Sequence, residues 1–224
     1  MLSLEQSEQF EIYYRMLVEW NERMNLTGIT EREAVYEKHF YDSLTVMMRA
    51  PQGVNNIHTM ADIGSGAGFP SVPIAIMLPE LRVTIVDSLN KRIQFLQALT
   101  DALGLKHVKG VHGRAEDVAR RTEHRDRYDL VSARAVARLS VLNELCLPFV
   151  RPQGHFAAMK GADPRLELEE AGNSLKKLKG TVRKVDQLEL PQERSERHIV
   201  WIHKTDATPP AYPRKAGTPA KTPL

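Results

Sequence analysis

Three closely spaced glycines mark the segment with the clearest chemical signature. Residues 62–69, Asp-Ile-Gly-Ser-Gly-Ala-Gly-Phe, follow a short apolar run and precede a helix-forming stretch. Glycine admits backbone angles that are closed to other residues, and the first turn of a helix offers unpaired N–H groups to a ligand. A strand, a glycine-rich turn and a helix in this order are typical of a nucleotide-cofactor site.

The spacing of the glycines and the acid before them narrow the choice of cofactor. Dinucleotide-binding turns use Gly-x-Gly-x-x-Gly, whereas Gly64, Gly66 and Gly68 are spaced Gly-x-Gly-x-Gly. Asp62 would suit a ligand with an ammonium group and would lie poorly beside a pyrophosphate. S-adenosyl-L-methionine carries an amino-acid end, a ribose and an adenine. The turn therefore predicts a methyl-donor site, with S-adenosyl-L-homocysteine as the product.

Two further carboxylates are expected beside the glycine turn, at the carboxyl ends of neighbouring strands. A buried strand run ends in Asp87, 23 residues after Gly64, about where Rossmann-type folds place the acid that binds ribose hydroxyls. A third strand run ends at His112, and Ala115 and Glu116 follow it. Ligands of open α/β sheets bind beyond the carboxyl ends of the strands, so these ends should converge on one crevice. The alternative, a purely structural glycine turn, does not explain this convergence.

The end of the fourth strand run, at Arg134, bears on the methyl acceptor. Amine methylation of adenine or cytosine would call for an Asn/Asp-Pro-Pro-aromatic stretch here, and C5 methylation of a pyrimidine would call for a nucleophilic cysteine. The chain lacks the stretch, and its single cysteine, Cys146, lies in an apolar helical segment. An acceptor with its own lone pair remains, such as guanine N7, which depends mainly on positioning. Arg134 could bind the guanine edge, hold the donor's carboxylate, or form a surface ion pair.

Four other polar residues are candidates for the same crevice. Lys160 ends the fifth strand run and could bind phosphate as a point charge, with a solvated lysine as the alternative. His39 and Asp42, three apart on a helix, could form a pair facing the crevice, with Asn25 in the preceding loop. Periodicity alone favours a helix-packing histidine. A zinc site would need further ligands at suitable spacing, and none is found, so no metal is expected.

Composition excludes several classes of protein. The chain has 224 residues, a net charge of +3 and a pI near 9.0, which is compatible with a nucleic-acid partner but modest. No apolar run approaches the roughly 18 residues of a membrane helix, and the N-terminus lacks the order of a signal peptide. A single cysteine excludes a disulfide framework. A cytoplasmic protein with no membrane contact is expected.

From Ile57 onward the pattern alternates between strands and helices, which predicts a parallel sheet covered on both faces. The expected strands are 57–63, 82–87, 107–112, 128–133, 153–160, 181–189 and 197–204. The expected helices are 69–78, 90–103, 115–121, 136–148 and 164–178. The last two strands are separated by a short break and should pair antiparallel. This α/β pattern of seven strands resembles the Rossmann-like methyltransferase sheet, in which the last strand runs against the others.

The two ends of the chain differ from this domain, which spans 57–204. Residues 1–56 predict a helical addition, with capping boxes at Ser3–Gln6 and Thr30–Glu33. Residues 205–224 contain five of the 13 prolines and few apolar side chains. Such a segment buries too little surface to offset its ordering entropy, so we expect a basic tail that is mobile until RNA binds. A disordered solvating tail is the alternative.

Six short motifs follow one another along the chain. They are Met24-Asn25-Leu26-Thr27, His39-Phe40-x-Asp42-Ser43-Leu44, the turn from Asp62 to Pro70, Arg114-Ala115-Glu116, Ala133-Arg134-Ala135-Val136-Ala137 and Lys160-Gly161. With this ordered set, and over nearly its whole length, the chain closely resembles the bacterial small-subunit ribosomal RNA guanine-N7 methyltransferases, also called glucose-inhibited division protein B.

The resemblance implies transfer of methyl from S-adenosyl-L-methionine to N7 of one guanine in 16S ribosomal RNA, within the small ribosomal subunit, by a monomer. It implies that the donor contacts are Gly64, Phe69, Ala115, Glu116 and Arg134. We expect the RNA contacts to be Arg138, Lys160, Arg214 and Lys215. The chain departs from the family at Ser71 and Ala216, which replace the usual glycine and proline. The first could tighten the helix start, and the second should only loosen the tail.

Two other functions remain open from the sequence. A nicotinamide-dependent oxidoreductase would share the fold, but the glycine spacing and Asp62 disfavour it. A ribosome-binding factor that kept the fold without catalysis would use the same residues. Titration of S-adenosyl-L-methionine against NAD separates the first from a methyltransferase, and only turnover on RNA separates the second.

Overall fold

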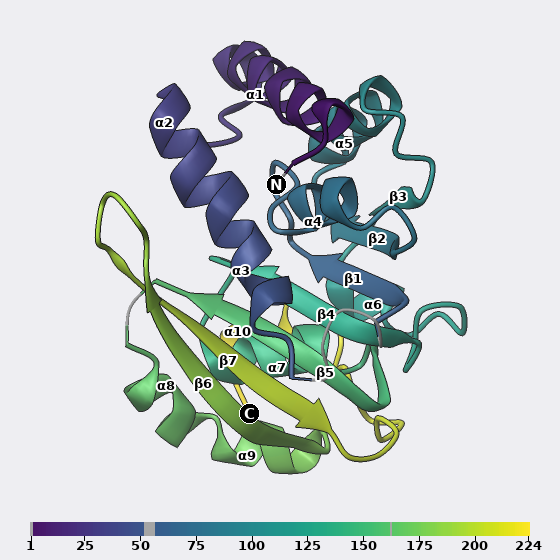
Figure 1. Ribbon diagram of the computed structural model, residues 1–224. Helices are drawn as coiled ribbons and strands as arrows, with labels where there is room; N and C mark the ends of the chain where they lie inside the picture. The colour runs from purple at the N-terminus through teal and green to yellow at the C-terminus, as the bar shows by residue number, and fades with distance from the viewer. Residues whose placement is uncertain (1, 52–56, 162) are drawn as a thin grey trace.

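The computed structural model describes residues 2–51, 57–161 and 163–224, which form one sheet covered by helices on both faces (Figure 1). The sheet has seven strands in the order β3-β2-β1-β4-β5-β7-β6. The strands are β1 (Thr59–Ile63), β2 (Arg82–Asp87), β3 (Val108–His112), β4 (Tyr128–Arg134), β5 (Val150–Lys160), β6 (Gly180–Glu189) and β7 (Glu196–Lys204). Strands β1 to β5 pair in parallel, and β7 runs antiparallel to both β5 and β6. The predicted sheet and its reversed last strand are confirmed.

The helices differ from the predicted ranges mainly at their ends. They are α1 (Leu4–Met24), α2 (Arg32–Val35), α3 (Asp42–Met48), α4 (Ser71–Met77), α5 (Asn90–Ala102), α6 (Ala115–Val118), α7 (Leu139–Cys146), α8 (Arg165–Glu170), α9 (Gly172–Lys177) and α10 (Thr218–Lys221). A π-helical turn, Tyr36–Tyr41, joins α2 to α3. The expected helix 164–178 is thus two short helices, and the N-terminal boundary at residue 56 lies outside the described residues.

The sheet separates two hydrophobic cores because successive side chains of a strand point to opposite faces. On β5, Ala157 and Met159 belong to the core beneath α1, α4 and α5, whereas Phe156 and Ala158 belong to the core beneath α7 and α9 (Figure 1). The N-terminal helices share the first of these cores. The carboxyl ends of β1 to β5 therefore lie between two fixed helical layers.

The N-terminal caps show one expected and one corrected feature. Ser3 and Gln6 form the predicted capping box of α1, with the Gln6 N–H donating to Ser3 Oγ at 3.1 Å. The capping box predicted at Thr30 is wrong, because α2 begins one residue later. The Glu31 side chain accepts hydrogen bonds from the N–H groups of Glu33 and Ala34 instead. A carboxylate caps a helix start as a hydroxyl does and also interacts favourably with the helix dipole.

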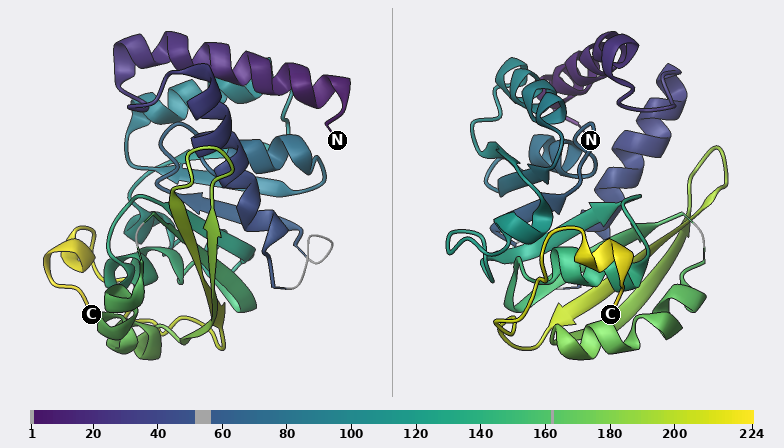
Figure 2. Two further views of the ribbon diagram at one scale, coloured as in Figure 1. Left: turned by 60° about the vertical axis from the view of Figure 1, so that its left-hand side comes forward. Right: turned by 180° about the vertical axis from the view of Figure 1, so that it is seen from behind.

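The C-terminal segment is packed, which corrects the prediction of a mobile tail. Arg125 donates to the backbone carbonyls of Thr208, Pro209 and Tyr212, and Arg120 donates to that of Pro213. The segment ends in α10, which lies beside α7 in the view from behind (Figure 2). Carbonyl groups of a proline-rich chain remain strong acceptors, so arginines can hold it without a large apolar surface.

Among the described residues, none of the helices combines the length and the apolar character that crossing a membrane requires.

Candidate active site

The glycine turn between β1 and α4 adopts the backbone that its sequence predicts. Gly64, Gly66 and Gly68 have φ of +73°, +62° and +102°, which side chains strongly disfavour. At Gly68 a Cβ would lie 2.7 Å from the Tyr13 hydroxyl oxygen, so this position also lacks space. Tyr13 donates that hydroxyl to the carbonyl of Ala67 at 2.6 Å. Helix α1 therefore stabilises the turn from behind.

A cavity of about 300 Å³ opens beside this turn at the ends of β1, β2 and β3. We call it the donor cavity. Its lining joins polar groups to an apolar wall and consists of Ile63, Gly64, Val86, Asp87, Ser88, Arg92, Gly113, Arg114, Ala115, Glu116, Ala135, Val136, Val141, Leu145 and Ala220. Gly64, Asp87, Ala115 and Glu116 all lie where the sequence predicts a donor site.

Both predicted carboxylates of the donor cavity are buried and already hold part of the backbone. Asp87 accepts the N–H of Leu89 at 2.9 Å and that of Gly66 at 3.3 Å. Glu116 accepts the N–H of Gly217 from the C-terminal segment at 2.7 Å. Buried carboxylates need such partners. Each bond fixes one oxygen and orients the carboxylate at the cavity wall.

Asp62 does not lie where the sequence places it. Its two oxygens accept the hydroxyls of Ser71 at 2.7 Å and Ser132 at 2.8 Å, and it is not among the residues that line the donor cavity. Burial raises the pKa of Asp62, while the serine hydroxyls act to lower it. Both oxygens of Asp62 are thus used inside the fold, where they connect the end of β1 to the start of α4 and to β4. Ser71, at the start of α4, thus bonds to Asp62, which a glycine at this position could not do through a side chain.

Phe69, like Asp62, is not among the residues that line the donor cavity. Its ring stacks on Tyr13 and on His39, with centroids 5.3 and 4.5 Å apart. The guanidinium of Arg134 lies 4.9 Å from the centroid of the Phe69 ring, within range of a cation–π interaction. Phe69 thus joins the glycine turn to the residues at the end of β4.

Arg134 brings together residues that are distant in the sequence. Its Nη1 donates to Asp42 Oδ2 and to the Lys38 carbonyl, each at 3.1 Å, and its Nη2 lies 3.2 Å from His39 Nδ1. His39 and Asp42 are therefore both at this site, as predicted, but they meet through Arg134. The π-helical turn that carries His39 widens the helix here, a feature frequent at functional sites.

The surroundings of His39 keep its ring neutral. Burial, reinforced by the positive charge of Arg134, lowers the pKa of His39 to about 4. Thr27 Oγ1 lies 2.8 Å from His39 Nε2. Thr27 lies in the Met-Asn-Leu-Thr motif, but its type and spacing alone do not indicate this contact. Asn25, which was predicted for the site, is exposed and ends α1 in a left-handed conformation, so its observed role is to cap that helix.

A second cavity, of about 410 Å³, lies on the other side of Arg134. Its lining is mostly basic or apolar and consists of Ile29, Lys38, His39, Asp42, Arg134, Ala135, Met159, Lys160, Gly161, Arg197, His198 and Ile199. Ala135 lines both this cavity and the donor cavity, and its φ of +55° is unusual for a residue with a Cβ. Two cavities that meet at one residue suit a transfer between two ligands.

A family model described as rRNA small subunit methyltransferase G matches residues 6–200. The chain belongs to this family. A relative of that name from Halalkalibacterium halodurans is 57% identical over 223 residues, which cover 100% of this chain and 93% of the relative. The relative of that name from Bacillus subtilis is 52% identical over 223 residues, with coverage of 100% and 92%. These findings confirm the resemblance noted in the sequence.

Solved methyltransferase structures share the fold. An O-methyltransferase from Bacillus cereus, in complex with SAH, has a TM-score of 0.59 and is 15% identical, covering 86% of this chain and 90% of its own. A SAM-dependent methyltransferase from Aquifex aeolicus has a TM-score of 0.56 and is 19% identical, with coverage of 78% and 95%. They confirm the predicted Rossmann-like methyltransferase architecture.

In this methyltransferase, two of the basic residues expected to contact RNA are used inside the fold. Lys160 Nζ donates to Glu167 Oε2 at 2.7 Å and to the Ala137 carbonyl at 2.9 Å, although Lys160 also lines the second cavity. Arg214 forms a two-pronged ion pair with the fully buried Glu144. Glu144 needs Arg214, because a buried carboxylate without a cation is destabilising, whereas Glu167 is only partly buried.

The other two expected RNA contacts lie on the surface of the methyltransferase. Arg138 pairs with Glu170 at 2.6 Å, and both side chains are more than half exposed. Lys215 is exposed in the C-terminal segment. Cys146 is buried, and burial raises its pKa well above the ordinary value, which agrees with its place in an apolar helical segment.

Proposed function

We propose that this enzyme transfers a methyl group from S-adenosyl-L-methionine to N7 of a guanine in 16S ribosomal RNA. Membership of the rRNA small subunit methyltransferase G family supports the class of substrate. The observation that carries the mechanism is the position of Ala135. It lines both the donor cavity and the second cavity, so a methyl donor in one would meet an acceptor base in the other.

The donor cavity has the chemistry that this donor needs. Asp87 and Glu116 offer carboxylate oxygens to the ribose hydroxyls, and Val141 and Leu145 offer an apolar wall to the adenine. S-adenosyl-L-methionine supplies an electrophilic methyl group on a sulfonium sulfur. Gly64 lines the cavity without a side chain, so a ligand can approach its main chain. A Cβ at this position would also lie 2.9 Å from Val136 Cγ2, so the turn has no room for another residue.

The second cavity needs no general base for this reaction. N7 of guanine carries a lone pair and no proton, so the protein has only to hold the ring in line with the methyl group. Arg134 is the central positioning residue. It donates hydrogen bonds to the Lys38 carbonyl and to Asp42, and its guanidinium also lies against the Phe69 ring. Phe69 in turn fixes the glycine turn. The walls of the donor cavity and of the second cavity are therefore connected through Arg134 and Phe69.

The RNA is proposed to present its target base to the second cavity, with the exposed side chains of Arg138 and Lys215 as phosphate contacts. A monomer acting in the cytoplasm on the small ribosomal subunit is the form we propose. The deciding experiment is to map 7-methylguanosine in small-subunit RNA from cells with and without the protein. We expect one site to lose its methyl group in the deletion strain and regain it on complementation. An unchanged methylation map would overturn the proposal.

Purified protein tests the donor separately. Calorimetric titration should give binding of S-adenosyl-L-methionine and none of NAD. Donor binding without turnover on small subunits or their RNA would instead indicate a binding factor that has kept the fold.

A further inference from the structure

Two buried polar atoms of the second cavity have no hydrogen-bond partner among the described residues. They are Asp42 Oδ1 and His198 Nδ1. Both residues line the cavity, and Asp42 is 3% and His198 5% exposed. Buried polar atoms are nearly always bonded, because leaving them unpaired is destabilising. Unpaired atoms on a cavity wall therefore point to a ligand that completes them.

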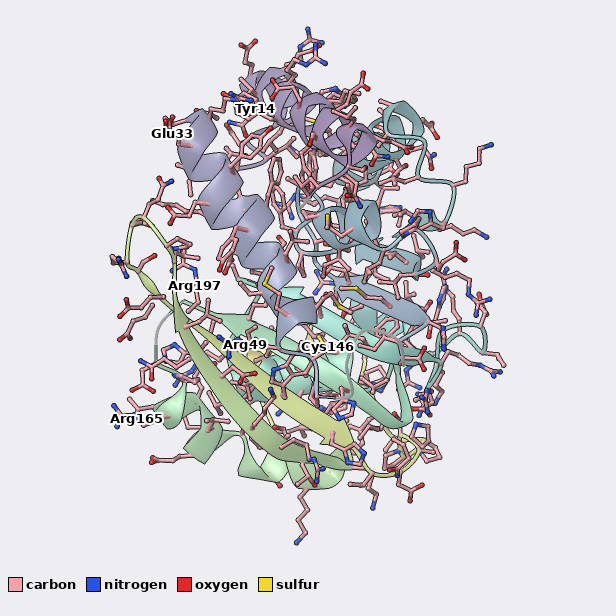
Figure 3. All side chains as sticks on the ribbon, viewed as in Figure 1. Tyr14, Glu33, Arg49, Cys146, Arg165 and Arg197 are labelled. Carbon is pink, nitrogen blue, oxygen red and sulfur yellow. The ribbon has the colours of Figure 1, made fainter. Side chains whose placement is uncertain are left out.

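The carboxylate of Asp42 is held so that one oxygen stays available. Asp42 Oδ2 accepts from Arg134 at 3.1 Å. Arg197 Nε lies 3.5 Å from Oδ1, close enough for charge attraction but without a hydrogen bond to that atom. Arg197 comes from β7, on the side of the sheet that faces the α2–α3 helix (Figure 3). The carboxylate is thus held between two cations, and its Oδ1 lacks a hydrogen bond.

Guanine is the base that matches a fixed acceptor of this kind. Its Watson–Crick edge carries two adjacent donors, N1–H and the N2 amino group, on the opposite side of the ring from N7. Adenine would place its N1 acceptor against the carboxylate, and cytosine its N3 acceptor. His198 Nδ1, in the tautomer that carries a proton there, matches O6, the acceptor beside N1.

We propose that the second cavity selects the target base by its Watson–Crick edge, with Asp42 Oδ1 accepting from N1–H and Oδ2, which also accepts from Arg134, accepting from the N2 amino group, while N7 faces the donor cavity at Ala135. This inference rests on the proposed function and deepens it. It requires the target guanine to be unpaired and turned out of its stack, because Watson–Crick edges are hidden in a duplex. Asp42 and His198 are then base-recognition residues, and Arg134 and Arg197 hold Asp42 in place.

The test replaces the target guanine by inosine, which keeps N7, O6 and N1–H and lacks only the N2 amino group. Small-subunit RNA carrying either base is methylated by the wild-type protein and by Asp42→Asn. We expect inosine to lower kcat/KM of the wild-type protein by roughly 5- to 150-fold, the range for one base-edge pairing. Asp42→Asn should be slow on guanine and should lose most of this discrimination. Asp101→Asn, at an exposed carboxylate on α5, is the matched control and should discriminate as the wild type does.

The outcomes separate the two proposals. No 7-methylguanosine with the wild-type protein on guanine RNA would overturn the proposed function itself. Methylation of guanine and inosine RNA at equal kcat/KM would overturn only the recognition by Asp42. The comparison on wild-type protein stands even if Asp42→Asn folds poorly. Calorimetry of S-adenosyl-L-methionine with each variant completes the test, since a recognition role leaves donor affinity within about twofold and loss of donor binding would assign Asp42 a structural role.

Discussion

The backbone N–H of Gly217 donates to Glu116 at 2.7 Å, so the C-terminal segment is bonded to a carboxylate of the donor cavity. Ala220, in the short helix that follows, lines the same cavity. Arg214 anchors the segment from the other side through its ion pair with Glu144. The proline-rich C-terminal segment is thereby one wall of the proposed donor site. We therefore expect changes in this segment to alter donor binding.

Removal of residues 215–224 should weaken donor binding. This truncation deletes the Gly217 N–H and Ala220 but keeps Arg214 beside Glu144. The truncation removes part of the cavity wall and the bond that orients Glu116, so we expect the Kd for S-adenosyl-L-methionine to rise by roughly tenfold, equivalent to about 1.4 kcal/mol. Calorimetry on the folded variant measures it. Lys221→Ala, an exposed side chain of α10, is the control, and equal Kd values for all three proteins would contradict the assignment.

Arg134→Ala should abolish methyl transfer and also destabilise the fold. The sequence suggests a residue that matters more to transfer than to folding, but the structure places its guanidinium against the buried Asp42. Loss of one partner of a buried ion pair costs roughly 3–5 kcal/mol, and the remaining Arg197 favours the low end. A protein of this size should then melt roughly 6–12 °C lower.

A double variant checks the cause of that loss of stability. Arg134→Ala with Asp42→Ala removes both charges, so its free energy of unfolding should exceed what the sum of the two single effects predicts. Strict additivity in urea denaturation would show that the two side chains do not stabilise each other.

Two glycines of the turn should differ in their sensitivity to alanine. At Gly68 a Cβ meets the Tyr13 hydroxyl at 2.7 Å and Val72 at 2.8 Å, whereas at Gly66 nothing lies within 4 Å. Both have positive φ, which costs alanine about 1–2 kcal/mol. Overpacking adds roughly 1–3 kcal/mol at Gly68 alone. Urea denaturation of the two variants measures the difference, and equal losses of stability would be inconsistent with the packing of α1 on the turn.

The neutral His39 predicts a loss of stability in acid. Its pKa is lowered to about 4 in the folded protein, so between pH 6.5 and pH 4 the unfolded chain binds a proton that the folded chain does not. The stability that the neutral ring contributes is complete above about pH 6.5 and falls as the pH decreases. The loss reaches about 2–3 kcal/mol by pH 4.5.

His39→Gln is the comparison that isolates this effect. Its free energy of unfolding should change less between pH 7 and pH 4.5 than that of the wild type. His155, whose pKa is also lowered to about 4, is present in both proteins and cancels. Burial raises the pKa of Asp42, which acts in the opposite direction in either protein. Parallel pH profiles would mean that His39 is not neutral in the fold.

Local patterns in the sequence determined most of the fold and the prediction of a donor site. Strand periods, the glycine spacing and an acid at the end of β2 each depend on residues close in the chain, and the structure brings the turn and the acid to one cavity. The confirmed capping box at Ser3 is of the same kind. One local signal was missed. Glu144 is an acid within an apolar helical stretch, which indicates a buried partner from elsewhere in the chain.

Only the tertiary structure decided which partner each buried charge has. Asp62 accepts from Ser132, 70 residues away, rather than facing the ligand, and Glu144 takes Arg214, also 70 residues away. A carboxylate taken out of water requires a donor or a cation, but the chain offers many, and the identity of the partner depends on how the layers pack. For this reason the sequence predicted the strand ends at which the proposed site lies, whereas the packing of the layers determined which side chains are used inside the fold and which line a cavity.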